Sequence, residues 1–254
     1  MLAELLPAEI FVVLLVFCRV GAAFMLLPGV GEPFVSPRVR LAMALLVSLL
    51  AAPVVRGGLP AQPESGAILV LLIAGEVMIG LFLGALTRFF IAAMNTAGMV
   101  IAYMSSLANA FTNDPTANEQ ASIAGAFLSL VAMLVVFALD LHHLLLKAVI
   151  DSYLLFVPGE MPPVGDFADL VSTTVAKTFL LALQIAAPFI GAGCVFYLGL
   201  GLLARLMPQV QIFFIAMPLQ IALGLVVLFA ALPIAIQWFV RGLTDTLRIF
   251  TGFP

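Results

Sequence analysis

Residues 211–240 read QIFFIAMPLQIALGLVVLFAALPIAIQWFV and contain no aspartate, glutamate, lysine or arginine. About 20 mainly apolar residues are enough for a helix to cross a bilayer. Residues 178–204 form a second run without charge. The sequence therefore predicts a membrane protein, with two of its spanning helices at 174–204 and 211–240.

The composition of the whole chain supports this class. Of 254 residues, 64% are hydrophobic and only 9% are charged, and the mean hydropathy is +1.26. Soluble domains carry about 25% charged residues, so this chain could not cover a soluble surface. The net charge of −3 argues against nucleic-acid binding. Glu4 and Glu9 stand where a signal peptide would be basic, so we expect the N-terminus to be mature sequence.

Four more apolar runs bring the prediction to about six long hydrophobic helices in an all-α fold. They are 5–27, 38–55, 66–88 and 120–139. Glu76 costs about 3 kcal/mol near a helix centre, but each Leu, Ile, Val or Phe of its run returns about 0.3–0.6 kcal/mol. Insertion is still favoured, and we expect Glu76 and Arg19 to face protein or water instead of lipid.

Proline and glycine interrupt these runs. Pro188, Pro218 and Pro233 predict kinks, since each removes one helical hydrogen bond. Gly80 and Gly84 are spaced for a close helix contact, although glycine is common enough here for chance to explain them. The glycine-rich range 191–201 suggests a second close-packing face.

Two longer connections are predicted. Residues 156–173 are acidic and turn-rich, which is typical of a solvated loop, and residues 103–120 form a polar stretch between two apolar runs. The positive-inside rule places the arginine-bearing odd loops in the cytoplasm and the acidic loop outside. Arg241 and Arg248 disagree with that assignment.

The polar inventory predicts no catalytic residue, no cofactor and no metal site, and hence no enzyme. The two histidines, His142 and His143, are adjacent and should point about 100° apart on a helix, so we expect them not to share a metal. Lys147 is expected to pair with Asp140 or Asp151. The two cysteines, Cys18 and Cys194, are expected to pack as small hydrophobes.

The other polar side chains are uncharged hydrogen-bonding groups, which in an apolar medium join helices or subunits. Residues of this kind include Asn95, Asn109, Gln209, Gln211 and Gln220. Glu76 is the one acidic residue deep in a run, and a single carboxylate makes a poor proton relay. A packing or pore-forming subunit is favoured over an independent transporter, and an intramembrane enzyme is the weakest alternative.

Three segments carry a resemblance to a known family. They are Arg19 to Pro28 with Pro37-Arg38-Val39-Arg40, Ala97 to Asp114-Pro115, and Leu198 to Phe213 with the Ala-Arg-x-x-Pro-Gln pattern. Together they resemble the FliR family of flagellar export proteins, whose injectisome counterparts are the T subunits of type III secretion. The order and spacing cover nearly the whole chain, although the family usually has Asn at Gln211 and often Lys at Gln220.

The resemblance implies an export-gate subunit of the bacterial inner membrane and flagellar basal body, built into a helical assembly with P- and Q-type subunits (FliP and FliQ). It also implies contact with the switch protein FlhB, passage of unfolded substrates and exposure to lipid. Residues 1–173 would be the P-like part, and 174–254 a Q-like hairpin with a C-terminal tail.

The resemblance also implies two groups of site residues. A pore plug over about 104–118 would include Met104, Leu107, Phe111, Asp114 and Pro115, with the first three forming an apolar face. Subunit assembly would involve Arg205, Pro208, Gln209 and Phe213.

Overall fold

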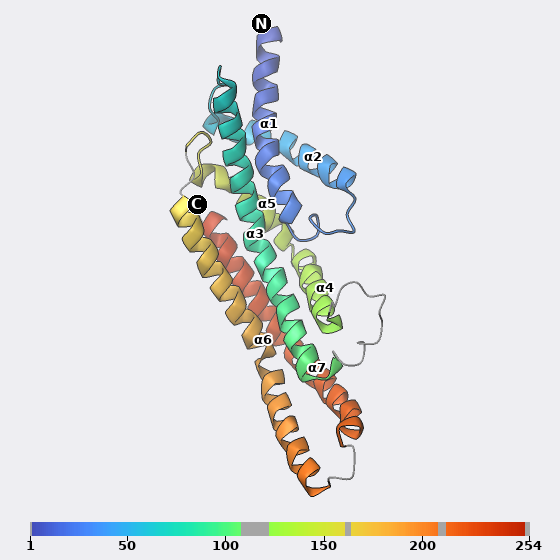
Figure 1. Ribbon diagram of the computed structural model, residues 1–254. Helices are drawn as coiled ribbons and strands as arrows, with labels where there is room; N and C mark the ends of the chain where they lie inside the picture. The colour runs from blue at the N-terminus through green and yellow to red at the C-terminus, as the bar shows by residue number, and fades with distance from the viewer. Residues whose placement is uncertain (1, 108–121, 161–163, 208–211, 252–254) are drawn as a thin grey trace. The chain divides into compact units, whose positions relative to one another are not determined.

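The computed structural model of the chain describes residues 2–107, 122–160, 164–207 and 212–251, and the regular secondary structure of these ranges is entirely helical (Figure 1). The described residues contain no strand, which confirms the predicted all-α class. The helices are α1 (Leu2–Leu26), α2 (Pro37–Val55), the short 3-10 helix η1 (Arg56–Gly58), α3 (Gly66–Met104), α4 (Ile123–Ala138), α5 (Leu141–Leu155), α6 (Val164–Leu206) and α7 (Ile212–Thr251).

The predicted number of long hydrophobic helices is confirmed. Over the described ranges, five helices are long and apolar enough to cross a membrane. The bent pair α4 and α5, which meet at 75°, would supply a sixth. Helix α5 was not predicted, because His142, His143 and Lys147 make its first half too polar to read as a span.

The predicted acidic loop at 156–173 is only half right, because residues 156–160 form a connection but α6 already begins at Val164. Asp166 lies in the first turn of α6, where the positive end of the helix dipole favours a carboxylate. Phe167 is buried, so this segment folds back as an amphipathic helix. Helix α7 likewise runs past the predicted end at residue 240 and includes Arg241 and Arg248.

The chain folds into two compact units. The first comprises residues 1–89, 136–175 and 243–254, and the second comprises 90–135 and 176–242. Each long helix, α3, α6 and α7, contributes one part to each unit.

Four phenylalanines from distant parts of the sequence form an aromatic core in the first unit. Phe82 of α3 stacks on Phe167 of α6, with ring centroids 4.1 Å apart and planes 8° from parallel. Phe156 meets the edge of Phe167 at 5.0 Å, and Phe250 of α7 meets Phe82 at 6.2 Å. Aromatic pairs at these separations are stabilising beyond their buried area. They tie the start of α6 and the end of α7 to α3.

Helices α1 and α3 approach each other closely through the predicted glycine step. A Cβ on Gly80 would lie 2.8 Å from the Cβ of Ala22 and would overlap the backbone carbonyl oxygen of Arg19. A Cβ on Gly84 would lie 2.8 Å from the Cβ of Leu26. The close contact that the spacing predicted is therefore real, because any side chain at these positions would separate the helices.

The same close approach brings Arg19 of α1 against Glu76 of α3. Arg19 Nε donates to Glu76 Oε2 at 2.7 Å, and Nη2 donates to Oε1 at 3.0 Å, so the pair is bidentate. The remaining nitrogens bond to Ser152 Oγ and to the Phe156 carbonyl, both at 3.0 Å, and the guanidinium lies 3.7 Å from the Tyr153 ring centre. Both charged residues are buried, as the prediction that they avoid lipid requires.

The second unit uses small residues in the same way. A Cβ on Gly98 of α3 would fall on the backbone of Gly125 in α4. Ser122 begins α4, because its hydroxyl accepts from the Gly125 amide at 3.2 Å and donates to the Gly98 carbonyl, also at 3.2 Å. Within the described part of the chain, the predicted close-packing face over 191–201 is found at Gly193 alone. A Cβ at Gly191, Gly199 or Gly201 would meet no described residue within 4 Å.

Much of the apolar surface faces outward. Leu50 of α2 is 74% exposed and Leu198 of α6 is 71% exposed. Helices that expose so many apolar side chains require lipid or other apolar protein around them.

The three prolines that interrupt the apolar runs do not end their helices. Pro188 lies inside α6, and Pro218 and Pro233 lie inside α7.

Removing one member of the buried ion pair should destabilise the first unit strongly. Glu76→Gln leaves the Arg19 guanidinium buried without a countercharge, and we expect a loss of about 3–5 kcal/mol in the free energy of unfolding. Urea denaturation of the chain in isolated membranes, followed by its susceptibility to protease, measures this. The double variant Arg19→Met, Glu76→Leu removes both charges and should lose much less. A double variant as unstable as Glu76→Gln would contradict the role of the pair.

Candidate functional site at the end of helix α3

The end of α3 forms a sharp, hydrogen-bonded turn where the polar stretch begins. Met104 is the last helical residue, and the Ser105 amide still donates to the Ile101 carbonyl at 2.9 Å. Ser106 then adopts φ 58°, a left-handed conformation that is uncommon for residues other than glycine. Ser105 and Ser106 are both buried. The chain therefore leaves α3 in a fixed direction.

Gln220 of α7 holds this turn with both ends of its side-chain amide. Its Nε2 donates to the Met104 carbonyl at 2.7 Å, which satisfies one of the carbonyls left open at a helix end. Its Oε1 accepts from the Ser106 hydroxyl at 2.8 Å. Gln220 is only 3% exposed, so both bonds are shielded from competing water.

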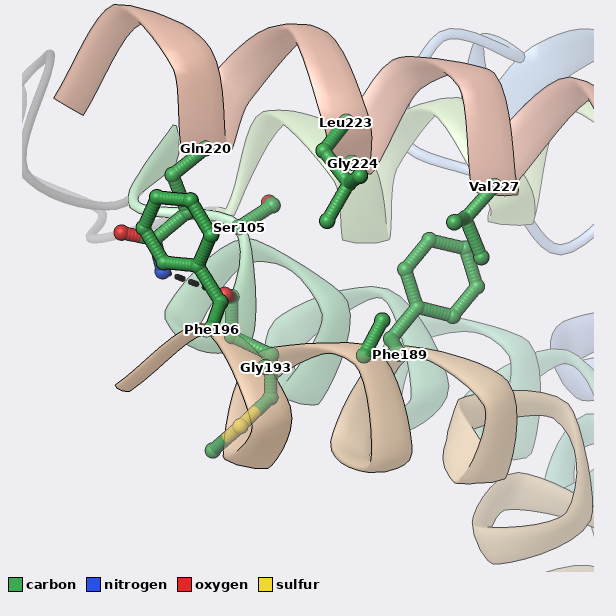
Figure 2. Close-up of a pocket in the computed structure, with 10 residues that line it drawn as sticks. Ser105, Phe189, Gly193, Phe196, Gln220, Leu223, Gly224 and Val227 are labelled. Atoms are coloured by element: carbon green, nitrogen blue, oxygen red, sulfur yellow. Dashed lines mark hydrogen bonds between the residues drawn. The ribbon is translucent and has the colours of Figure 1, made fainter. Parts of the chain in front are cut away.

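Two glycines bring α6 and α7 against the same turn. A Cβ on Gly224 would overlap the Cβ of Ser105, and one on Gly193 would lie 3.2 Å from the sulfur of Met104. Figure 2 shows these residues with Phe189, Phe196 and Leu223 around a cavity of about 10 Å³, which has room for about one water molecule. The end of α3 is thus packed tightly between the two helices.

The residues predicted to form the plug are only partly described. Met104 and Leu107 are half-buried at and just after the end of α3. The left-handed Ser106 between them interrupts the helix, so they do not continue one helical face as the spacing suggested. Phe111, Asp114 and Pro115 lie outside the described residues.

The residues predicted for assembly lie around the connection between α6 and α7. Arg205 is exposed in the last turn of α6. Pro208 and Gln209 lie outside the described residues, and of Phe213 only the backbone, in the first turn of α7, is described.

The histidine pair departs from its prediction. His142 and His143 lie with ring centres 4.1 Å apart, and one ligand atom each from these rings and from Asp140 fall within 4.8 Å of one another. Asp140 lies at φ 56° in the break before α5, so the carboxylate and both rings gather at one helix end. The prediction that the two rings point apart is therefore wrong. Asp140 lies 3.8 Å from His143, and among the described ion pairs neither Asp140 nor Asp151 is joined to Lys147.

The two cysteines differ in burial. Cys18 is half-buried, whereas Cys194 is exposed on α6, and both thiols are free.

Sequence reasoning missed two groups of polar residues. Arg19 and Glu76 were each placed away from lipid but were not paired, although opposite charges in neighbouring apolar runs were a signal for it. Gln220 was noted as polar, yet nothing in its spacing revealed that it would reach Ser106 across 114 positions.

These features define a class: an all-helical membrane protein with a buried ion pair and a clamped polar segment between apolar helices. Residues 10–246 match the family described as bacterial export proteins, family 1. The chain belongs to this family.

Relatives across the family cover most of the chain. It is 39% identical over 244 residues to a flagellar biosynthetic protein FliR of Caulobacter vibrioides, which covers 96% of this chain and 97% of the relative. The FliR of Bacillus subtilis is 29% identical, with 87% and 86% covered. The Yop proteins translocation protein T of Yersinia pestis is 26% identical, with 88% and 87% covered. The resemblance to the FliR family is confirmed.

Replacing Gln220 should loosen the end of α3. Gln220→Leu leaves the Met104 carbonyl and the Ser106 hydroxyl buried without partners, at a cost of about 1–3 kcal/mol for each group. We expect faster hydrogen exchange in a peptide covering residues 101–107, measured by mass spectrometry. Gln237→Leu is the matched control, since Gln237 lies on the same helix with an exposed side chain. Equal exchange in both variants would contradict the clamp.

Proposed function

We propose that this chain is a core channel subunit of the flagellar type III protein-export gate, passing unfolded flagellar proteins across the bacterial inner membrane. The observation that carries the proposal is the 39% identity to a flagellar FliR protein over nearly the full length of both chains. Energy for export would come from partner components, and this chain would supply part of the conduit within the flagellar basal body.

The outward apolar faces support a role inside a larger assembly. Leu46, Leu49, Leu50 and Val54 expose more than half of their surface along α2. In the proposed gate such faces pack against P- and Q-type subunits, FliP and FliQ, or against lipid, while FlhB contacts the assembled gate. Residues 1–173 would form the P-like part and 174–254 the Q-like hairpin with its tail.

The clamped end of α3 supports the proposed plug. A polar segment cannot face lipid, because its backbone groups would stay unsatisfied. The two hydrogen bonds of Gln220 fix the point from which this segment leaves α3. In the proposal, Met104, Leu107 and Phe111 supply apolar side chains that close the pore, and Asp114-Pro115 belongs to the same segment.

The connection between α6 and α7 supports a role in assembly. Arg205 carries an exposed positive charge at the end of a helix whose preceding residues are apolar. In the proposal, Arg205, Pro208, Gln209 and Phe213 contact neighbouring subunits.

The runner-up function is the equivalent subunit of a virulence injectisome. The similarity to the Yersinia translocation protein T, over 88% of this chain, favours it over an independent transporter. The lower identity, 26% against 39%, places the flagellar system first.

The gate proposal predicts that the chain is stable only with its partners. Coexpressed with P- and Q-type subunits it should copurify as one complex, and expressed alone it should aggregate or be degraded. Arg205→Glu should reduce recovery of the Q-type subunit, because the reversed charge opposes the native contact. Arg205→Lys and Lys177→Glu, a reversal at an exposed position of the same helix, are controls. A monodisperse chain that binds a small solute on its own would favour the transporter.

The plug proposal predicts a leak in the resting state. Deleting 107–111 should make cells or vesicles that contain the assembled gate permeable to ions and small molecules, measured by dye or ion flux. A length-matched replacement of these residues by Gly and Ser separates the loss of apolar side chains from the shortening of the segment. Unchanged permeability in both variants, with copurification intact, would refute the plug.

A further inference from the structure

The break between α4 and α5 brings three potential metal ligands to one place. The two helices meet at 75°, and Asp140 makes the break with φ 56° and ψ 20°. Backbone hydrogen bonds hold the turn on both sides, from the Asp140 amide to the Phe137 carbonyl at 3.2 Å and from the His143 amide to the Asp140 carbonyl at 3.0 Å. Asp140 is the residue at the break, and His142 and His143 lie in the first turn of α5.

The side chains of these residues converge. One carboxylate oxygen of Asp140 and one nitrogen of each histidine ring all lie within 4.8 Å of one another. The Asp140 oxygen lies 3.8 Å from His143 Nδ1. Ligands of a bound Zn²⁺ sit about 2.0–2.2 Å from the ion, so only small side-chain rotations would bring the three onto one cation.

The carboxylate of Asp140 is not used as a helix cap. An aspartate at the residue before a helix usually accepts a hydrogen bond from an amide of the first turn. Asp140 occupies that position of α5 but makes no such bond. Its charge is instead directed toward the histidines. Asp140 therefore does not cap α5, and its carboxylate is available to a ligand.

His142 is held in place but not satisfied. Its ring stacks on Phe137, with centroids 5.2 Å apart and planes 30° from parallel. Its Nδ1 is buried and has no hydrogen-bond partner among the described residues. A buried polar atom without a partner is costly, and a cation or a bound water would relieve that cost.

We propose that Asp140, His142 and His143 bind a divalent transition-metal ion of the Zn²⁺ class. Two imidazoles and one carboxylate are a ligand set that suits Zn²⁺, Co²⁺ or Ni²⁺, whereas Mg²⁺ and Ca²⁺ prefer oxygen ligands alone. Asp140 and His143 are 77% and 72% exposed, so water fills the remaining coordination positions. The ion links the break residue to the first turn of α5 and so fixes the start of that helix.

The composition of the chain makes the test specific, because His142 and His143 are its only histidines. The full chain, copurified with its partners through a tag without histidine, is titrated with Co²⁺. Visible absorption and the displacement of Co²⁺ by Zn²⁺ report binding. We expect one ion per chain, and His143→Ala and Asp140→Asn should each weaken binding by about tenfold or more. Asp151→Asn, a carboxylate on the same helix, should leave affinity unchanged.

A second readout does not depend on the variants folding. Carbethoxylation of the wild-type histidines, followed by mass spectrometry, should slow when Zn²⁺ is present and remain unchanged when Mg²⁺ is present. A His142→Ala, His143→Ala double variant whose complex binds as much Co²⁺ as the wild-type complex would overturn the proposal. Equal reaction rates of the histidines with and without Zn²⁺ would also overturn it. Asp140 and His143 would then make only a local contact.

Discussion

The buried pair between Arg19 and Glu76 is the constraint on which the first unit depends. A charge inside an apolar region is tolerated only when it is paired and its remaining hydrogen-bonding groups are satisfied. Arg19 meets that condition by bonding to Glu76, Ser152 and the Phe156 carbonyl. The pair therefore fixes the register of α1 on α3, and it draws α5 and the residue after it into the same core.

Small residues make that pairing possible and set a pattern for the second unit. Gly80 and Gly84 allow α1 to lie close enough for Arg19 to reach Glu76. Gly193 and Gly224 allow α6 and α7 to close on the end of α3, where Gln220 holds the turn at Ser106. In both units, small residues allow close backbone approach, and a buried polar contact specifies one arrangement among the many that apolar helices could adopt.

The proposed role in export fits a chain that turns so much apolar surface outward. Large side chains along α2, α6 and α7 are exposed, and they require lipid or neighbouring subunits. The polar contacts inside the chain fix where its segments begin and end, while its outer faces remain for assembly. The break at Asp140 shows the same use of local polar contacts, because backbone hydrogen bonds hold the turn before α5.

The sequence by itself determined the membrane class, the approximate positions of the apolar helices and the family. Hydropathy and sequence motifs depend only on residues that are neighbours along the chain. It also predicted the close contact at Gly80 and Gly84. Only the tertiary structure decided which polar groups meet. The pairing of Arg19 with Glu76, the clamp of Gln220 on Ser106 and the start of α6 at Val164 all depend on residues far apart in the chain. His142 and His143 both lie on α5, so the approach of their rings depends on side-chain rotation, which spacing along the chain does not predict, and the backbone turn at Asp140 adds the carboxylate.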